Sequence, residues 1–329
     1  MGINDYKEMP SFVVQIGVVT MFFKFLITAA GVFFISVPSI ASAFDVGLGV
    51  GAHVGTFDAA GQEFTKELGP HSIRAGYGRK QDFVINWAAQ NGKSVVFMLG
   101  YGQGVDVKTA SGRQAYADRS ADLAQTYGSY VEYYQVWNEW NGGFGLGCEW
   151  NEPPCNDAAM YTDLLCKTYK AIKAVQRSAK VAGGVVAGAN KTFITGMLDA
   201  GAGDCMDVLD LHLYVYRQNW PGHVAADAPG WVGADKFIQV INDRQNLVRA
   251  KTGRTIPIIV SEAGFHGSNE QLEAEYITEL YEQSSAVPFL KGIWWYQLKD
   301  AKKGNFGLLR NNNTKKPGFA AFQAAAARL

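Results

Sequence analysis

Eight short apolar runs alternate with eight helical patterns between Phe44 and the C-terminus, and no other feature of this sequence constrains the fold as strongly. Runs such as SVVFMLG (94–100) are apolar without interruption, which is typical of strands buried on both faces of a parallel sheet. The expected strands are Val46–Gly51, Ser72–Ala75, Ser94–Leu99, Val131–Trp137, Val181–Ala187, Val208–Val215, Pro257–Ser261 and Gly292–Tyr296. The expected helices span residues 59–68, 80–91, 113–128, 158–178, 191–201, 233–251, 269–285 and 317–328.

This alternation predicts an α/β fold, a single (β/α)8 TIM barrel, because eight strand–helix units fit the usual size of that fold, about 250 residues. The runner-up is an open doubly wound sheet, but no GxGxxG fingerprint follows the first expected strand, and the glycines of GLGVG (47–51) lie inside it. No linker divides the sequence, and the last helical pattern ends at the C-terminus. We therefore expect one domain over residues 44–329, without an appended β-sandwich.

The first 43 residues have the pattern of a secretory signal peptide. Residues 11–37 carry no charge except Lys24, so the whole stretch is also long enough for an uncleaved membrane anchor. A start at Met21 makes Lys24 the positive region and Phe25–Val37 the apolar region, and Ala41-Ser42-Ala43 the cleavage site. We predict cleavage after Ala43 and a secreted or periplasmic protein, with residues 1–20 either an over-extended start or a long positive region.

The four cysteines show neither a CxxC motif nor a Cys/His ligand spacing, so a structural zinc site is not expected. In an oxidising compartment Cys148 and Cys155, seven residues apart, form the natural bridge, although four cysteines permit three pairings. The alternative of buried free thiols suits Cys166 best, because it lies in an apolar helical pattern; Cys205 is the fourth cysteine.

The charge balance excludes two classes of partner. Thirty Lys and Arg residues offset thirty Asp and Glu residues, which gives no electrostatic footprint for nucleic acid or for an anionic membrane. With only five histidines, metal-dependent hydrolysis on this fold is also disfavoured, and we expect neither a metal nor a cofactor.

Tryptophans gather where the active site of a barrel forms, at the carboxyl ends of the strands and in the loops that follow. Aromatic faces stack on the C–H faces of sugars, so this distribution favours a carbohydrate ligand. Packing of the barrel rim is the alternative for Trp137 and Trp295. The seven tryptophans concerned are Trp137, Trp140, Trp150, Trp220, Trp231, Trp294 and Trp295.

Two glutamates carry the strongest chemical signal. Glu139 lies in YYQVWNEWNG (133–142) at the end of the fourth strand, where two tryptophans would desolvate it and suit it to donate a proton. Glu262 lies in IIVSEAGFHG (258–267) and is the first charged residue after the seventh strand, at the mouth of the barrel. Because these strands face each other across the ring, the pair is suited to glycoside hydrolysis, in which one carboxyl protonates the leaving oxygen and the other attacks the anomeric carbon.

These segments resemble the clan of retaining glycoside hydrolases with (β/α)8 barrels, in which Asn-Glu ends strand four and a lone Glu ends strand seven. WNEWN (137–141) and VSEAGF (260–265) match both motifs, and the resemblance covers residues 44–329. Arg74 in SIRAG, His212 and Tyr214 in DLHLYVY, and the eighth-strand segment WWYQLKD (294–300) add to the match. The sequence is most similar to glycoside hydrolase family 39, which includes β-xylosidases, α-L-iduronidases and bacterial exopolysaccharide hydrolases. Many members carry an extra β-sandwich, which is not expected here.

The resemblance implies a role for each matched residue. Glu139 would be the acid/base and Glu262 the nucleophile, with their carboxyl groups about 5–5.5 Å apart as in retaining enzymes. The implied supporting roles are a hydrogen bond to the sugar 2-hydroxyl for Asn138, ionisation of Glu262 for Arg74, a hydrogen bond to Glu262 for Tyr214, a site-lining position for His212 and a stacking platform for Trp294.

Independently of the resemblance, His53 at the end of the first strand is expected either to touch substrate or to cap the barrel. The expected substrate is an oligo- or polysaccharide, a β-glycan or a bacterial exopolysaccharide, and the expected state is a monomer. The alternative function is a catalytically silent carbohydrate-binding barrel. Both glutamates argue against it, because silence usually follows the loss of one of them.

Overall fold

The computed structural model describes residues 44–50, 57–78, 81–101, 104–148, 152–153, 156–216, 233–301 and 304–329. Within these residues eight parallel strands follow one another in chain order and close into a barrel, with β1 pairing both β2 and β8. The closed ring confirms the predicted TIM barrel and excludes the open sheet. The strands are β1 (Asp45–Gly49), β2 (Ser72–Gly76), β3 (Ser94–Met98), β4 (Val131–Gln135), β5 (Lys180–Ala187), β6 (Val208–Tyr216), β7 (Ile258–His266) and β8 (Leu290–Trp295).

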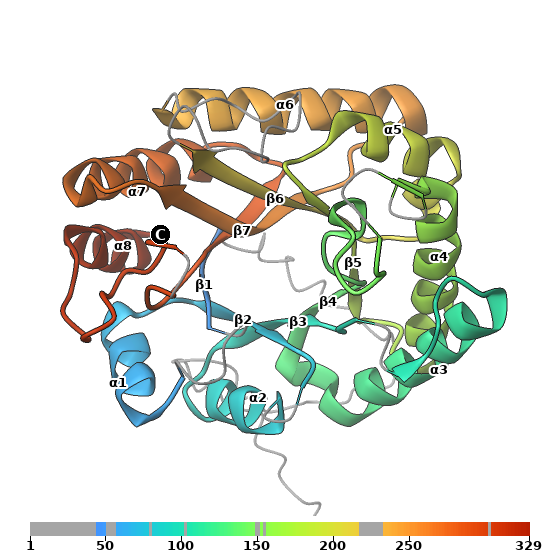
Figure 1. Ribbon diagram of the computed structural model, residues 1–329, viewed down its shortest axis with the longest axis horizontal. Helices are drawn as coiled ribbons and strands as arrows, with labels where there is room; N and C mark the ends of the chain where they lie inside the picture. The colour runs from blue at the N-terminus through green and yellow to red at the C-terminus, as the bar shows by residue number, and fades with distance from the viewer. Residues whose placement is uncertain are drawn as a thin grey trace, which may run out of the picture. The chain divides into compact units, whose positions relative to one another are not determined.

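Helices lie outside the strands and surround them (Figure 1). Several begin at side chains that accept a backbone N–H, as Asp58 does from Gly61 at 2.9 Å before α1, which satisfies an otherwise orphaned donor. Gly69 ends the same helix in a left-handed conformation that glycine adopts readily. The helices are α1 (Ala59–Leu68), α2 (Gln81–Gln90), α3 (Ala110–Tyr127), α4 (Ala158–Val175), α5 (Lys191–Asp199), α6 (Gly233–Thr252), α7 (Glu270–Ser285) and α8 (Pro317–Arg328).

The predicted elements agree with the observed ones within a few residues at most ends, and β7 is the main exception. It continues past its predicted end at Ser261 to His266. The extension pairs in parallel with the end of β6, from Leu213 opposite Ala263 to Tyr216 opposite His266. Glu262 therefore lies inside a paired strand rather than after it.

Cys166 of α4 forms a disulfide with Cys205, whose Cα atom lies 4.8 Å away. The alternative of a free thiol at Cys166 is therefore wrong. The apolar helical pattern indicates only that Cys166 faces inward. Cys205, 39 residues later in the sequence, follows a segment before β6 that packs against the same helix. Cys155 lies outside the described residues, so the bridge between Cys148 and Cys155 stays a prediction.

Among the helices that the structure describes, none is both long and apolar enough to cross a membrane. The predicted signal peptide and its cleavage site after Ala43 lie outside the described residues.

Candidate active site

Glu139 follows β4 in a backbone conformation that non-glycine residues rarely adopt, with φ at 47°. Its N–H donates to the carbonyl of Val185 in β5 at 2.9 Å, which ties the turn to the neighbouring strand. Trp137 is also left-handed, with φ at 69°. Such strain concentrates at functional sites, where the surrounding structure must hold it. The result here is that the Glu139 side chain faces His212 of β6.

The two tryptophans beside Glu139 pack against the helices. Trp137 contacts Tyr116 of α3, and Trp140 contacts Tyr161 of α4; both tryptophans are fully buried. Their faces are covered, so neither presents a stacking surface for a sugar. Rim packing, the alternative considered for Trp137, is the role the structure supports.

Trp294 is fully buried in a layer of the barrel interior, where its indole N–H donates to Ser72 Oγ at 3.1 Å. A ring without exposed surface cannot stack under a sugar, so the predicted platform role is wrong. Trp295 is fully buried as well and donates to the carbonyl of Phe306 at 3.2 Å. The other three tryptophans of this prediction lie outside the described residues, and so does His53. These tryptophans are Trp150, Trp220 and Trp231.

Two donors hold the carboxyl group of Glu262. Arg74 of β2 donates from Nη1 to Oε1 at 2.5 Å, and the Tyr214 hydroxyl donates to Oε2. Burial favours the neutral acid, but the attraction to His212 when its ring is protonated, the charge of Arg74 and these hydrogen bonds outweigh it. The pKa of Glu262 is therefore held below its usual value. A carboxylate kept ionised in a buried site is suited to act as a nucleophile.

His212 stands between the two glutamates. Its Nδ1 lies 2.8 Å from Glu139 Oε1 and 3.4 Å from Glu262 Oε2. One oxygen of each carboxyl group and one nitrogen of His212 all lie within 4.8 Å of one another. Burial opposes the charged imidazole, yet the charge of Glu262 and the contact with Glu139 raise the His212 pKa.

A bulge in β7 turns two consecutive side chains toward the barrel interior. The register between β6 and β7 shifts after Leu211, so Glu262 pairs with His212 and Ser261 is skipped. The N–H of Ser261 donates instead to Asp210 Oδ1 at 3.1 Å, which satisfies the donor that the ladder leaves out. Bulges next to active sites re-aim side chains in this way.

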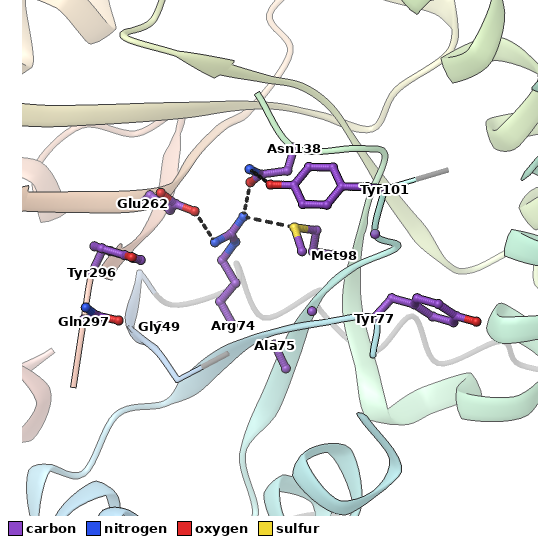
Figure 2. Close-up of a pocket in the computed structure, with 12 residues that line it drawn as sticks. Gly49, Arg74, Ala75, Tyr77, Met98, Tyr101, Asn138, Glu262, Tyr296 and Gln297 are labelled. Atoms are coloured by element: carbon purple, nitrogen blue, oxygen red, sulfur yellow. Dashed lines mark hydrogen bonds and ion pairs between the residues drawn. The ribbon is translucent and has the colours of Figure 1, made fainter. Parts of the chain in front are cut away.

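Arg74 is fixed by more than its ion pair, as Figure 2 shows. Its Nε donates to Gln135 Oε1 at 2.7 Å and its Nη2 to Asn138 Oδ1 at 2.8 Å. Asn138 in turn donates from Nδ2 to the Tyr101 hydroxyl at 2.8 Å. Gln135 and Tyr101 belong to the site although the sequence did not predict them. The sequence could have indicated Gln135, because it lies two residues after Tyr133 in the same strand and residues two apart point to the same face.

A cavity of about 250 Å³ opens beside Glu262. Tyr77 and Tyr101 are the exposed aromatic residues of its wall, 44% and 42% accessible. Tyr101 lies beside Asn138, whereas the ring of Tyr77 points away from Arg74 and Glu262 (Figure 2). Tyrosines therefore offer exposed aromatic surface here that the described tryptophans do not. The wall is formed by Gly49, Arg74, Ala75, Gly76, Tyr77, Met98, Gly100, Tyr101, Asn138, Glu262, Tyr296 and Gln297.

Glu139, His212 and Glu262 are close enough together to be considered as metal ligands. Their facing atoms, however, already contact one another, and both oxygens of Glu262 accept hydrogen bonds from Arg74 and Tyr214. A divalent cation here would also lie near the guanidinium of Arg74. The donor set therefore fits proton transfer and nucleophilic attack better than metal binding.

The structure thus brings together six of the predicted site residues: Arg74, Asn138, Glu139, His212, Tyr214 and Glu262. No family model and no curated protein matches the sequence. The chain is similar in structure to a family 39 glycoside hydrolase from the gut symbiont Bacteroides cellulosilyticus WH2, with a TM-score of 0.66 and 20% identity over 88% of this chain and 65% of that one.

Two further solved structures show the same likeness. A monomeric β-xylosidase from Caulobacter crescentus CB15 has a TM-score of 0.63 and 19% identity, covering 85% of this chain and 67% of its own. A GH39 enzyme from Xanthomonas axonopodis pv. citri has a TM-score of 0.66 and 17% identity, covering 88% and 67%. The chain thus spans about two thirds of the length of these proteins. At this identity the likeness establishes the shared barrel fold.

Proposed function

We propose that the protein is a retaining glycoside hydrolase that cleaves O-glycosidic bonds by double displacement. The observation that carries the proposal is the pairing of Glu139 and Glu262 at the mouth of the barrel. One carboxyl oxygen of Glu139 lies within 4.8 Å of one carboxyl oxygen of Glu262. Retaining enzymes hold their two carboxyl groups about 5–5.5 Å apart, whereas inverting enzymes leave about 6.5–9.5 Å for a water molecule. The close pairing supports retention.

In the first step Glu262 is the nucleophile. Its carboxylate attacks the anomeric carbon while Glu139 gives its proton to the leaving oxygen, which yields a covalent glycosyl-enzyme. In the second step Glu139, now ionised, takes a proton from water, and the resulting hydroxide displaces Glu262. Arg74 and Tyr214 support both steps, because they stabilise Glu262 as an anion before attack and after release.

Asn138 is positioned to bind the sugar. Arg74 fixes its Oδ1 as an acceptor, and one hydrogen of Nδ2 goes to Tyr101. The second hydrogen of Nδ2 is assigned to the 2-hydroxyl, a contact that strengthens in the oxocarbenium-like transition state. Tyr101, which lies beside Asn138, is assigned to the apolar face of a bound sugar.

The proposed substrate is an oligo- or polysaccharide, a β-glycan or a bacterial exopolysaccharide, acted on by a monomer outside the cytoplasm. The disulfide between Cys166 and Cys205 supports export, since such bonds persist mainly in oxidising compartments. Residues 1–43 are the proposed signal peptide.

A screen of aryl glycosides, with the anomer of the first product read by NMR, tests the proposal. We expect the product to keep the configuration of the substrate, and an inverted product would refute the mechanism. A 2-fluoro glycoside should label Glu262, as located by peptide mass spectrometry. Glu262→Ala should abolish turnover, whereas Glu63→Gln on the exposed face of α1 should not change it. Sugar binding without turnover in the unmodified protein would instead indicate the silent barrel.

A further inference from the structure

Beneath the two glutamates lies a chain of hydrogen bonds whose direction can be read from the chemistry of its members. It starts at Arg74, which stays protonated in proteins and can only donate. The atom of Gln135 that lies 2.7 Å from Arg74 Nε is therefore the amide oxygen. This contact fixes the orientation of the Gln135 amide without reference to its other neighbours.

With its oxygen on Arg74, Gln135 points its NH2 group toward β6 and β7. Nε2 donates to Asp210 Oδ2 and, at 2.6 Å, to Ser261 Oγ, which uses both of its hydrogens. Ser261 must accept in that contact, because an amide nitrogen is not an acceptor. The hydroxyl of Ser261 can then give its hydrogen to Nε2 of His212, 3.1 Å away, or to the carboxyl group of Asp210, with which its side chain also interacts. Both oxygens of Asp210 already accept hydrogen bonds, from the Ser261 N–H and from Gln135, which favours Nε2 of His212 as the acceptor.

A nitrogen that accepts a hydrogen bond carries no proton of its own. We propose that Ser261 and Gln135 are positioning residues that keep Nε2 of His212 unprotonated, so that His212 is a neutral imidazole with its single proton on Nδ1. That proton lies toward Glu139 Oε1, 2.8 Å away. The two ring nitrogens of His212 thereby have opposite, fixed roles.

The consequence for the reaction rests on the function proposed above. Because Oε1 of Glu139 accepts the N–H of His212, the acid proton of Glu139 resides on Oε2. That proton passes to the leaving oxygen as the glycosidic bond breaks and the bond from Glu262 to the anomeric carbon forms. A second proton on His212 would instead stabilise Glu139 as a carboxylate and deplete the acid.

The groups around His212 make this control necessary. Glu139 of the β4 turn and Glu262 of β7 both attract a positive imidazole, and Arg74 of β2 opposes it. Asp210 of β6 adds a further buried carboxyl group below. Ser261 acts against the attraction directly, because it hydrogen-bonds to the neutral ring at the nitrogen where the second proton would bind.

Nitrogen-15 NMR of the histidine side chains at neutral pH tests the inference without a substrate. In the unmodified protein we expect a protonated Nδ1 and an unprotonated Nε2 for His212, assigned by loss of the signals in His212→Gln. A protonated Nε2 would overturn the proposal. Ser261→Ala should allow Nε2 to take up a proton, and an unchanged signal in that variant would overturn the role of Ser261.

Two further variants separate this role from general packing. Ser261→Thr keeps the hydroxyl and should retain the unprotonated Nε2. Ser284→Ala makes the same change at a buried serine of α7 and should leave the His212 signals unchanged.

The catalytic part is read from leaving groups. In Ser261→Ala, kcat/KM should fall by about tenfold more for an unactivated glycoside than for a dinitrophenyl glycoside, which needs little acid assistance. Equal losses on both substrates would overturn this part. If the unmodified protein hydrolyses no glycoside, the proposed function fails, while the NMR signals of His212 still decide the protonation pattern.

Discussion

The ion pair between Arg74 and Glu262 can be measured from the pH dependence of kcat/KM, because the acid limb of that profile follows the ionisation of Glu262. Arg74 Nη1 lies 2.5 Å from Glu262 Oε1, and both side chains are largely buried, 8% and 12% exposed. Unit charges about 4 Å apart attract by about 4 kcal/mol at an effective dielectric constant of about 20. At about 1.36 kcal/mol per pKa unit this attraction corresponds to about 3 units, and carboxylates beside arginine commonly shift by about 1–3 units.

Removing the charge should therefore raise the Glu262 pKa. Since Glu262 must be ionised to attack, the acid limb of kcat/KM in Arg74→Gln should move to higher pH by about 1–3 units. Arg74→Lys is the matched control, because it keeps the positive charge but cannot reproduce the contacts to Gln135 and Asn138. It should lose activity while its acid limb stays much closer to that of the unmodified protein.

The assay is kcat/KM for an aryl glycoside across the pH range in which each variant stays folded, with folding followed by circular dichroism. An acid limb that stays in place in Arg74→Gln would refute the electrostatic role assigned to Arg74. Equal shifts in both variants would refute it as well, because the hydrogen bonds rather than the charge would then set the Glu262 pKa.

Three further predictions concern Glu139, the disulfide and the buried carboxyl group of Asp45. Glu139→Gln should lower kcat by about 10²–10⁴-fold on an unactivated glycoside and far less on a dinitrophenyl glycoside, and similar losses on both would contradict its role as acid. Cys205→Ala should cost about 4 kcal/mol of unfolding free energy for a loop of 39 residues, measured by urea denaturation; we expect unchanged kcat because the bond lies outside the site. Burial and the nearby Glu132 raise the pKa of Asp45 to about 8. The folded state therefore binds more protons than the unfolded state between about pH 4 and pH 8. The contribution of Asp45 to the stability of the folded protein therefore falls as the pH rises through that window. Relative to the unmodified protein, Asp45→Asn should gain more in melting temperature at pH 8 than at pH 4. A difference between the two proteins that is the same at both pH values would contradict this.

The barrel could be predicted because its signals are local and repeated. Each buried strand is a short apolar run, and each helix has its own periodic pattern, so an error at one end does not alter the topology. Glu139 and Glu262 were predictable in the same way, since each ends an apolar run. Where the structure differs, adjacency in the sequence was taken for adjacency in space. Trp137 and Trp140 flank Glu139 along the chain, yet their rings pack toward α3 and α4.

The supporting residues were harder to predict because a change of register positions them. In a regular strand Ser261 and Glu262 would point to opposite faces, and only one of them could reach the site. The bulge in β7 brings both inward, so one strand supplies the proposed nucleophile and the hydroxyl that faces His212. Asp210 accepts both the N–H left free by the bulge and a hydrogen of Gln135, which links the backbone irregularity to the orientation of the amide. The bulge is thus the structural cause that joins the environment of Glu262 to that of Glu139, and a variant that restored regular pairing in β7 would disturb both together.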